Sequence, residues 1–206
     1  MNLELRGLYA ITPEDFLLPR LSAMVGAALK GGVKLVQYRN KTAPAPLRRA
    51  QATELLRICR AAGAKLIIND DVALALEIDA DGAHLGRNDG DLAAARAALG
   101  PDRILGVSCY NELARAEAAA AASADYLAFG AVYASATKPD AVPAPLSLLA
   151  EAKRFGLPIA AIGGITIDTA GSVIEAGADM VAVVTDLFDT MDIAARAAEY
   201  QNLFAN

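Results

Sequence analysis

The sequence predicts an α/β protein, a (β/α)8 TIM barrel in which residues 1–206 form a single domain. Short apolar runs recur along the chain, and each is followed by a stretch rich in Ala, Leu and Arg. This alternation is typical of a parallel sheet covered by helices. Eight such runs occur, about 26 residues apart on average, and no Ser-, Gly- or Pro-rich linker divides the chain. Eight units favour a closed barrel over an open sheet.

The expected strands are short runs of nearly continuous apolar character, as in strands that are buried on both faces. The first run reads Gly-Leu-Tyr-Ala-Ile, and the eighth reads Asp-Met-Val-Ala-Val-Val. In chain order, the predicted strands comprise residues 7–11, 33–38, 65–69, 82–85, 103–107, 125–130, 158–162 and 179–184.

Helix signals lie between these runs. The Ala-rich segments 93–98 and 114–122 are predicted to be helices because Ala has the highest helix propensity. The Pro-rich segment 137–145 is too short for a domain linker and is predicted to be a loop after the sixth strand. Four side chains stand where helix N-caps are expected: Asp71, Asp91, Asn111 and Asp168.

Composition excludes several classes of protein. The net charge is -5 and there is no Trp, so no nucleic-acid partner is predicted. Cys59 and Cys109 are far apart in sequence, and His84 is the one histidine, which argues against a disulfide framework and a zinc site. Neither a signal peptide nor a membrane span is evident, so we expect a cytoplasmic protein with no membrane partner. The sequence carries no signal for a particular oligomeric state.

The most informative polar cluster follows the second predicted strand. Because side chains alternate along a strand, Gln37, Arg39 and Lys41 are expected to share one face with Val33 and Leu35. Two cations and an amide at the end of a core face are costly to bury without a partner. An anion, above all a phosphate group, is the expected partner. The alternative is a strand that runs into solvent with ordinary surface charges.

Carboxylates follow the next two strands, at the end of the barrel where active sites of this fold form. Asp70 follows the third strand and Asp89 the fourth, so we expect these two carboxylates to converge. Magnesium takes one or two carboxylates and completes its shell with water and phosphate oxygens, which suits this pair. The alternative for Asp89 is a loop turn near Gly90, whereas Asp71 is interpreted as a helix cap.

The remaining strand ends are also polar. Ser108 is expected to donate a hydrogen bond to an anion; a Ser–His–Asp hydrolase is not predicted, because His84 is interpreted as a core residue. Lys138 stands in a loop from which it can close over a phosphate, although it is equally a candidate for a solvated lysine. Gly163 and Gly164 follow the seventh strand and permit close approach of a ligand to the backbone, or simply form a tight turn.

Several motifs in the same order along the chain resemble the thiamine phosphate synthase family, whose members are (β/α)8 barrels. The resemblance covers nearly the whole sequence. It is carried by residues 8–12, 36–41, 68–71, 81–86, 106–108, 128–130, 135–139, 161–165 and 176–179.

The resemblance implies a transferase that joins hydroxymethylpyrimidine diphosphate to thiazole phosphate, with Mg²⁺ as cofactor and diphosphate as leaving group. It implies that Asp70 and Asp89 bind the metal. The residues implied to hold the pyrimidine diphosphate are Gln37, Tyr38, Arg39, Asn40, Lys41, Asn69, Ser108 and Lys138, of which Arg39, Lys41, Ser108 and Lys138 are implied to be catalytic. Those implied to hold the thiazole phosphate are Ser135, Ala136, Thr137, Gly164, Val184 and Thr185.

The chemistry implied by the family is a dissociative substitution, which needs charge neutralisation and positioning more than a protein nucleophile. Three positions depart from the commoner pattern: Tyr110 stands where many relatives carry His, Arg87 follows Gly86 where Gln is frequent, and Thr185 replaces a frequent Ser. The alternatives are a thiazole tautomerase of the same superfamily, which uses a histidine for proton transfer, and a non-catalytic barrel that binds thiamine precursors and regulates a partner. Tyr110 and the intact cation and carboxylate sets argue against both.

Overall fold

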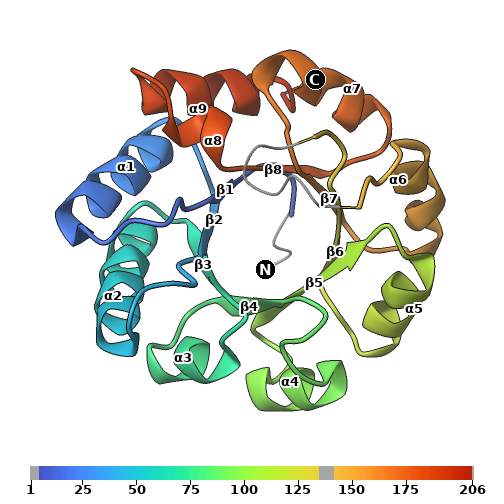
Figure 1. Cartoon of the computed structure of the whole chain (residues 1–206), viewed down its shortest axis with the longest axis horizontal. Coiled ribbons are helices and arrows are strands. Elements are labelled where there is room, and N and C mark those ends of the chain that lie inside the picture. The colour runs from blue at the N-terminus through green and yellow to red at the C-terminus, as the bar shows by residue number, and fades with distance from the viewer. Residues whose placement is uncertain (1–4, 135–141, 206) are drawn as a thin grey trace.

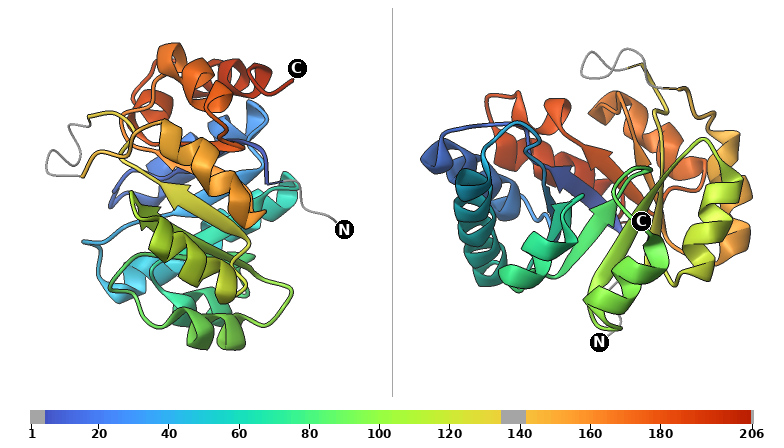
Figure 2. Two further views of the ribbon diagram at one scale, coloured as in Figure 1. Left: turned by 90° about the vertical axis from the view of Figure 1, so that its right-hand side faces the viewer. Right: turned by 60° about the horizontal axis from the view of Figure 1, so that its bottom comes forward.

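Eight parallel strands form a closed barrel that is surrounded by helices (Figure 1). The computed structural model describes residues 5–134 and 142–205. Neighbouring strands pair in the order β1-β2-β3-β4-β5-β6-β7-β8, and β8 closes the barrel against β1. The side views in Figure 2 show the strands crossing the middle of the molecule with helices outside them. The predicted (β/α)8 fold is confirmed.

All eight predicted strands are present. They are β1 (Gly7–Ile11), β2 (Leu35–Tyr38), β3 (Lys65–Asn69), β4 (Gly82–Leu85), β5 (Ile104–Tyr110), β6 (Tyr126–Phe129), β7 (Ile159–Ile162) and β8 (Met180–Val183). Two boundaries differ from the prediction by two residues or more, and each of the others agrees to within one residue. Strand β2 begins at Leu35, so Val33 packs in the layer under the helices and does not share the interior face. Strand β5 continues past Ser108 to Tyr110, with a register shift between these two residues.

Helices follow the strands and cover the outside of the barrel. They are α1 (Leu18–Lys30), α2 (Ala45–Ala61), α3 (Val72–Glu77), α4 (Leu92–Leu99), α5 (Leu113–Ala121), α6 (Ser147–Ala152), the 3-10 turn η1 (Lys153–Phe155), α7 (Ile167–Glu175), α8 (Thr185–Phe188) and α9 (Ile193–Asn202). Among the residues that the structure describes, none of these helices combines the length and apolar character of a membrane span.

Two of the four predicted helix caps are confirmed. The carboxylates of Asp71 and Asp91 each accept a hydrogen bond from a backbone N–H in the first turn of α3 and α4. The predictions for Asn111 and Asp168 are wrong. The N-cap position of α5 is Glu112, one residue after Asn111, and Asp168 lies inside the first turn of α7. Thr166 caps α7 instead, because its hydroxyl forms a capping box with the third residue of the helix.

The core has two layers that correspond to the two faces of the strands. The larger cluster lies between the strands and the helices, and the smaller one fills the barrel interior. Glycine makes room for one large interior side chain: a Cβ atom on Gly106 would lie 2.1 Å from the ring of Tyr126 on the neighbouring strand. The absence of that Cβ allows the Tyr126 ring to cross the interior, where it meets Tyr9 and His84.

Candidate active site

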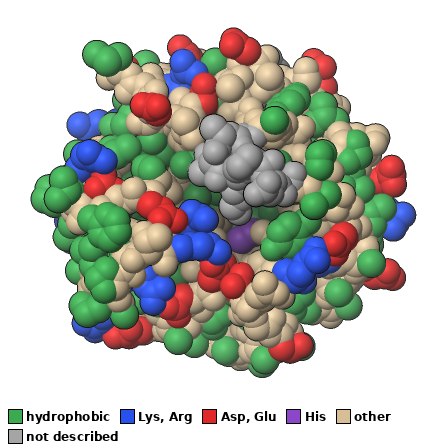
Figure 3. Space-filling view, viewed as in Figure 1, with side chains coloured by type: hydrophobic (Ala, Val, Ile, Leu, Met, Phe, Trp, Pro, Cys, Tyr) green, Lys and Arg blue, Asp and Glu red, His purple; other side chains and the backbone are tan. Residues whose placement is uncertain are grey.

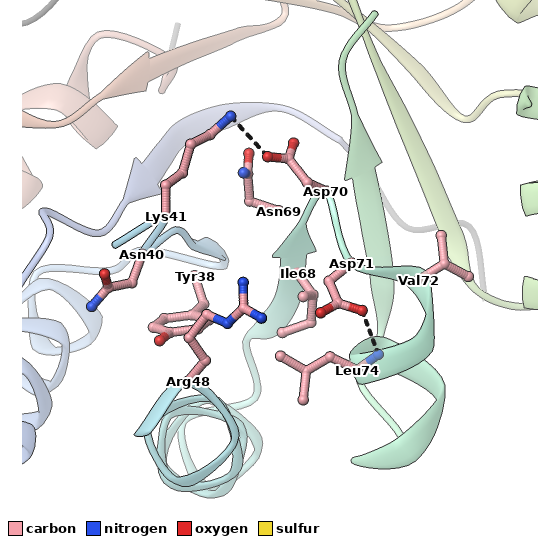
Figure 4. Close-up of a pocket in the computed structure, with 10 residues that line it drawn as sticks. All are labelled: Tyr38, Asn40, Lys41, Arg48, Ile68, Asn69, Asp70, Asp71, Val72 and Leu74. Atoms are coloured by element: carbon pink, nitrogen blue, oxygen red, sulfur yellow. Dashed lines mark hydrogen bonds and ion pairs between the residues drawn. The ribbon is translucent and has the colours of Figure 1, made fainter. Parts of the chain in front are cut away.

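Charged and amide side chains meet where the carboxyl ends of the parallel strands come together. Figure 3 shows basic and acidic side chains gathered around a hollow in this face of the molecule. A cavity of about 290 Å³ lies at the ends of β2 and β3 (Figure 4). Five of the predicted site residues line it: Tyr38, Asn40, Lys41, Asn69 and Asp70.

Lys41 and the two predicted metal ligands form one charged cluster. The Nζ atom of Lys41 lies 2.9 Å from Oδ2 of Asp70 (Figure 4), and the carboxyls of Asp70 and Asp89 are close enough to shift each other's pKa. Burial works against the charge on Asp70, but Lys41 and Asp89 hold its pKa below the ordinary value. Burial and the neighbouring Asp70 raise the pKa of Asp89. The two carboxylates therefore converge, as the strand order led us to expect.

This donor set fits a magnesium ion. Two carboxylates that approach this closely repel each other unless a proton or a cation lies between them, as the raised pKa of Asp89 indicates. In the part of the chain that the structure describes, no group of three or more His, Cys, Asp or Glu side chains is placed to hold a metal. Two carboxylates with water and diphosphate oxygens make a suitable shell for Mg²⁺.

Arg39 pairs with a residue that sequence analysis missed. Its Nη1 atom lies 3.0 Å from Oε1 of Glu14, in the loop after β1. Burial opposes the charge on Glu14, but hydrogen bonds from Thr42 and from the backbone of Lys41, together with Arg39, hold the pKa of Glu14 below its usual value. The cations at the end of β2 thus have protein partners. The partners come from other loops, so nothing in the sequence next to Arg39 and Lys41 pointed to them.

Tyr38 and Asn40 line the cavity, but their polar atoms bond elsewhere within the protein. The Tyr38 hydroxyl donates to Gln51 Oε1 of α2 at 2.7 Å, and Asn40 Nδ2 donates to the same oxygen and to the Asp15 carbonyl. Both residues therefore brace the β2–α2 loop. Arg48 of α2 also reaches this cavity, and its buried Nε atom has no hydrogen-bond partner (Figure 4). Nothing in the sequence distinguished Arg48 from the other arginines of its helix.

A chain of hydrogen bonds crosses the barrel interior. Gln37 Nε2 donates to the Tyr9 hydroxyl at 2.7 Å, which lies 2.7 Å from the Tyr126 hydroxyl. The Tyr126 hydroxyl lies 2.9 Å from Nδ1 of His84, and His84 Nε2 lies 2.8 Å from Oγ of Ser108. Sequence analysis missed Tyr9 and Tyr126, and it assigned His84 to core packing. Strand alternation, applied to every strand, would have placed Tyr9, Gln37, His84 and Ser108 on the interior face.

The contact between Ser108 and His84 is not that of a hydrolase. The second ring nitrogen of His84 is bonded to a tyrosine hydroxyl and not to a carboxylate. Burial lowers the pKa of His84 to about 4, with Asp70 and Arg115 as the neighbouring charges. An imidazole of such low basicity is a poor general base for a serine nucleophile. The geometry agrees with chemistry that uses no protein nucleophile.

Arg115 of α5 holds the ends of β4 and β5 together. Its Nε atom donates to the carbonyl of Ser108 at 2.6 Å, and its Nη2 atom donates to the carbonyl of Gly86 at 2.7 Å. The Gly86 N–H in turn donates to Oδ2 of Asp89 at 2.7 Å. One guanidinium group therefore positions both Ser108 and the loop that carries Asp89.

Tyr110 braces the same loop. Its backbone has a φ of 55°, and its hydroxyl accepts a hydrogen bond from the Arg87 N–H at 3.1 Å. The guanidinium carbons of Arg87 and Arg115 lie 4.9 and 5.9 Å from the centre of its ring. Tyr110 thus contacts the loop that carries Asp89.

Three of the six residues predicted to hold the thiazole phosphate are among the residues that the structure describes. Gly164, Val184 and Thr185 stand after the paired strands β7 and β8. Gly164 has a φ of 60°, and a Cβ atom there would lie 2.4 Å from the carbonyl oxygen of Ala134, so the turn requires glycine. The other three, Ser135, Ala136 and Thr137, lie outside the described residues, as does Lys138 of the predicted diphosphate site.

A closed (β/α)8 barrel with cations and paired carboxylates at the carboxyl ends of its strands defines a barrel enzyme of the phosphate-handling class. The sequence model of the family described as Thiamine monophosphate synthase matches residues 8–187. The chain belongs to this family.

Individual relatives agree over nearly the whole chain. The chain is 58% identical to the Thiamine-phosphate synthase of Aromatoleum aromaticum over 97% of both sequences. It is 54% identical to that of Methylobacillus flagellatus, over 97% of this chain and 96% of the relative. Among solved structures, the thiamine phosphate pyrophosphorylase from Pyrococcus furiosus superposes with a TM-score of 0.86 at 32% identity, over 97% of this chain and 96% of that one. The predicted family, its transferase class and its synthase activity are confirmed.

Proposed function

We propose that this chain condenses hydroxymethylpyrimidine diphosphate with thiazole phosphate to give thiamine phosphate and diphosphate, with Mg²⁺ bound by Asp70 and Asp89. The observation that carries the metal and leaving-group assignment is the cluster in which Lys41, Asp70 and Asp89 meet at one end of the barrel. A diphosphate with its metal needs both cations and carboxylates in one place, and this cluster supplies them.

Charge neutralisation is the main task of these residues. The bond between the pyrimidine methylene and the diphosphate oxygen breaks first, and a bond from the methylene carbon to the thiazole nitrogen then forms. Negative charge accumulates on the departing oxygen, and Arg39 and Lys41 are placed at the end of β2 to receive it. Bound magnesium supplies further positive charge to the same leaving group.

Arg39 and Lys41 can change partners when diphosphate binds. In the structure, Glu14 compensates the charge of Arg39 and Asp70 that of Lys41. The side chain of Lys41 is 50% exposed and that of Arg39 is 23% exposed. A diphosphate carries more charge than either carboxylate, so it competes for both cations. Asn69, at the rim of the same cavity, is assigned to the diphosphate as well.

The remaining assignments complete the proposal. Gln37, Tyr38, Asn40, Ser108 and Lys138 are assigned to the pyrimidine diphosphate, and Ser135, Ala136, Thr137, Gly164, Val184 and Thr185 to the thiazole phosphate. For Tyr38 and Asn40, the internal hydrogen bonds favour a supporting role. Small-molecule substrates, a cytoplasmic location and the absence of nucleic-acid and membrane partners belong to the same proposal.

The two alternatives lack a supporting observation. A tautomerase would use a histidine where this chain has Tyr110, whose hydroxyl is bonded to the Arg87 N–H. A non-catalytic regulator has no need for converging carboxylates beside Lys41.

The test is to incubate the purified protein with both substrates and Mg²⁺ and to measure thiamine phosphate and diphosphate. We expect both products in equal amounts, and loss of both in excess chelator. Arg57→Ala, which removes an exposed ion pair with Glu54, is the matched control for variants of Arg39. Turnover that persists in chelator would refute the metal assignment, and no product under any condition would refute the function.

A further inference from the structure

We propose that Tyr9, Tyr126 and His84 are positioning residues that orient the Ser108 hydroxyl as a hydrogen-bond donor toward an anionic group at the barrel mouth. The proposal rests on the proposed function, because it takes that anion to be the diphosphate. It adds three residues that act through Ser108.

The chain of hydrogen bonds is buried and packed in the barrel interior. Its inner members are buried, with exposed fractions of 1% for Tyr9, 0% for Tyr126, 6% for His84 and 3% for Gln37. They come from four different strands of the barrel. The Tyr9 and Tyr126 rings meet edge to face at 88°, and His84 stacks on Tyr126 with 22° between the rings. Packing therefore holds each polar atom at hydrogen-bond distance from the next.

With the amide nitrogen of Gln37 facing Tyr9, only one direction of donation satisfies every member. Gln37 donates to the Tyr9 oxygen, so the single Tyr9 hydrogen needs an acceptor, and the oxygen of Tyr126 lies 2.7 Å away. The Tyr126 hydrogen then points to Nδ1 of His84. In the opposite direction, the Tyr9 hydrogen would be buried without an acceptor, which is unfavourable.

This direction of donation determines which ring nitrogen of His84 carries the proton and where the hydroxyl hydrogen of Ser108 points. Because Nδ1 accepts, the neutral imidazole carries its proton on Nε2 and donates it to Ser108 Oγ at 2.8 Å. The serine oxygen is then an acceptor on its inner side, and its own hydrogen is directed elsewhere. Ser108 is half-buried at the end of β5, with its carbonyl held by Arg115. Its hydroxyl hydrogen is thus available to an anionic oxygen at the mouth.

The test compares Tyr126→Phe, Ser108→Ala and the double variant. The readouts are the dissociation constant of inorganic diphosphate with Mg²⁺, measured by titration calorimetry, and kcat/KM. Without the Tyr126 hydroxyl, Nδ1 of His84 is no longer held as an acceptor. The Ser108 hydroxyl can then turn inward and donate to His84 instead of to the anion. We expect diphosphate binding to weaken about fivefold in Tyr126→Phe. In the Ser108→Ala background the same change should have no further effect, because its target is gone.

Tyr200→Phe is the matched control. Tyr200 is also fully buried, and its hydroxyl donates to Asp186 at 2.7 Å, but it lies outside the chain of hydrogen bonds. This control should lose stability and keep its affinity for diphosphate. Where Tyr126→Phe does not fold, Tyr9→Phe breaks the chain one link further from Ser108 and should show the same dependence on Ser108.

Two outcomes would overturn the proposal: unchanged diphosphate binding in a folded Tyr126→Phe protein, or effects of Tyr126→Phe and Ser108→Ala that simply add. Failure of the proposed function is distinguishable, because the wild-type protein itself would then neither bind diphosphate with Mg²⁺ nor form thiamine phosphate.

Discussion

The Nζ atom of Lys41 lies 2.9 Å from Oδ2 of Asp70, so a cation assigned to diphosphate and a carboxylate assigned to magnesium are ion-paired with each other. Each is the counter-charge of the other, and under the proposed function each is expected to be released when its own ligand binds. Binding of the metal and binding of the diphosphate are therefore expected to favour one another at this pair.

If Lys41 and Asp70 exchange each other for diphosphate and Mg²⁺, Lys41→Ala should change the affinities for these two ligands in opposite directions. Removal of the ammonium group leaves Asp70 without its competitor, so Mg²⁺ alone should bind more tightly. Diphosphate should bind more weakly, because a charge-assisted contact is lost. Titration calorimetry with each ligand checks both signs. Lys153→Ala, which removes a similarly exposed lysine from its pair with Asp179, is the control, and a fall in Mg²⁺ affinity for Lys41→Ala would contradict the exchange.

Asp70 and Asp71 are neighbours with different predicted roles. Asp70→Asn should raise the Mg²⁺ concentration needed for half-maximal activity by roughly tenfold or more, since even indirect support of a metal ligand is worth this much. Asp71→Asn should leave that concentration unchanged, because Asn also serves as an N-cap for α3. A Mg²⁺ titration of activity distinguishes the two, and equal responses would argue against metal binding by Asp70.

Arg39→Ala should strongly impair diphosphate handling. A charge-assisted hydrogen bond contributes about 1.5–3 kcal/mol, which corresponds to roughly a 10- to 150-fold loss in kcat/KM. The variant also leaves Glu14 without its cation, which repels an anionic substrate further. Steady-state kinetics measure the loss, and unchanged kinetics would remove Arg39 from the site.

Tyr110→Phe should matter less than Lys138→Ala. The Tyr110 hydroxyl supports the Asp89 loop through one hydrogen bond from the Arg87 N–H, a contribution of about 1 kcal/mol. No proton transfer is assigned to it, whereas Lys138 is assigned to the leaving diphosphate. Rates of the two variants under saturating Mg²⁺ provide the comparison. The reverse ranking would favour the tautomerase alternative.

His84 makes the stability of the fold depend on pH. Its pKa is lowered to about 4, so the folded protein keeps it neutral while the unfolded chain protonates it near pH 6.5. The unfolded state then binds more protons between these values, and stability falls as the pH is lowered from about 6.5 to about 4. The loss is roughly 3 kcal/mol.

Urea unfolding at pH 7, 5.5 and 4 measures this loss. The His84→Asn variant does not titrate in this range and should lose less stability than the wild-type protein over the same interval. Carboxyl groups titrate in both proteins and cancel in the comparison. Equal slopes for the two proteins would show that His84 is protonated in the folded state as readily as in the unfolded chain.

Part of the candidate site could be predicted from short stretches of the sequence. The end of β2 presents Gln37, Arg39 and Lys41, and the closure of parallel strands brings Asp70 and Asp89 together in the order expected. Strand order alone carries this information, since carboxyl ends of parallel strands lie on one side. Partners from distant loops, such as Glu14 for Arg39, left no signal near the residues they serve.

The barrel and the polar residues at its mouth could be predicted from the sequence, because the alternation of apolar strands and helices is a local property of the chain. The contacts of those residues could not, because they depend on how distant segments come together in the folded protein. Tyr9, Tyr126 and His84 are ordinary strand residues in sequence, and they form one hydrogen-bonded chain because barrel closure turns their side chains to a shared interior. The register that sets Gly106 beside Tyr126 makes room for that chain, and pairing register between strands is a long-range property.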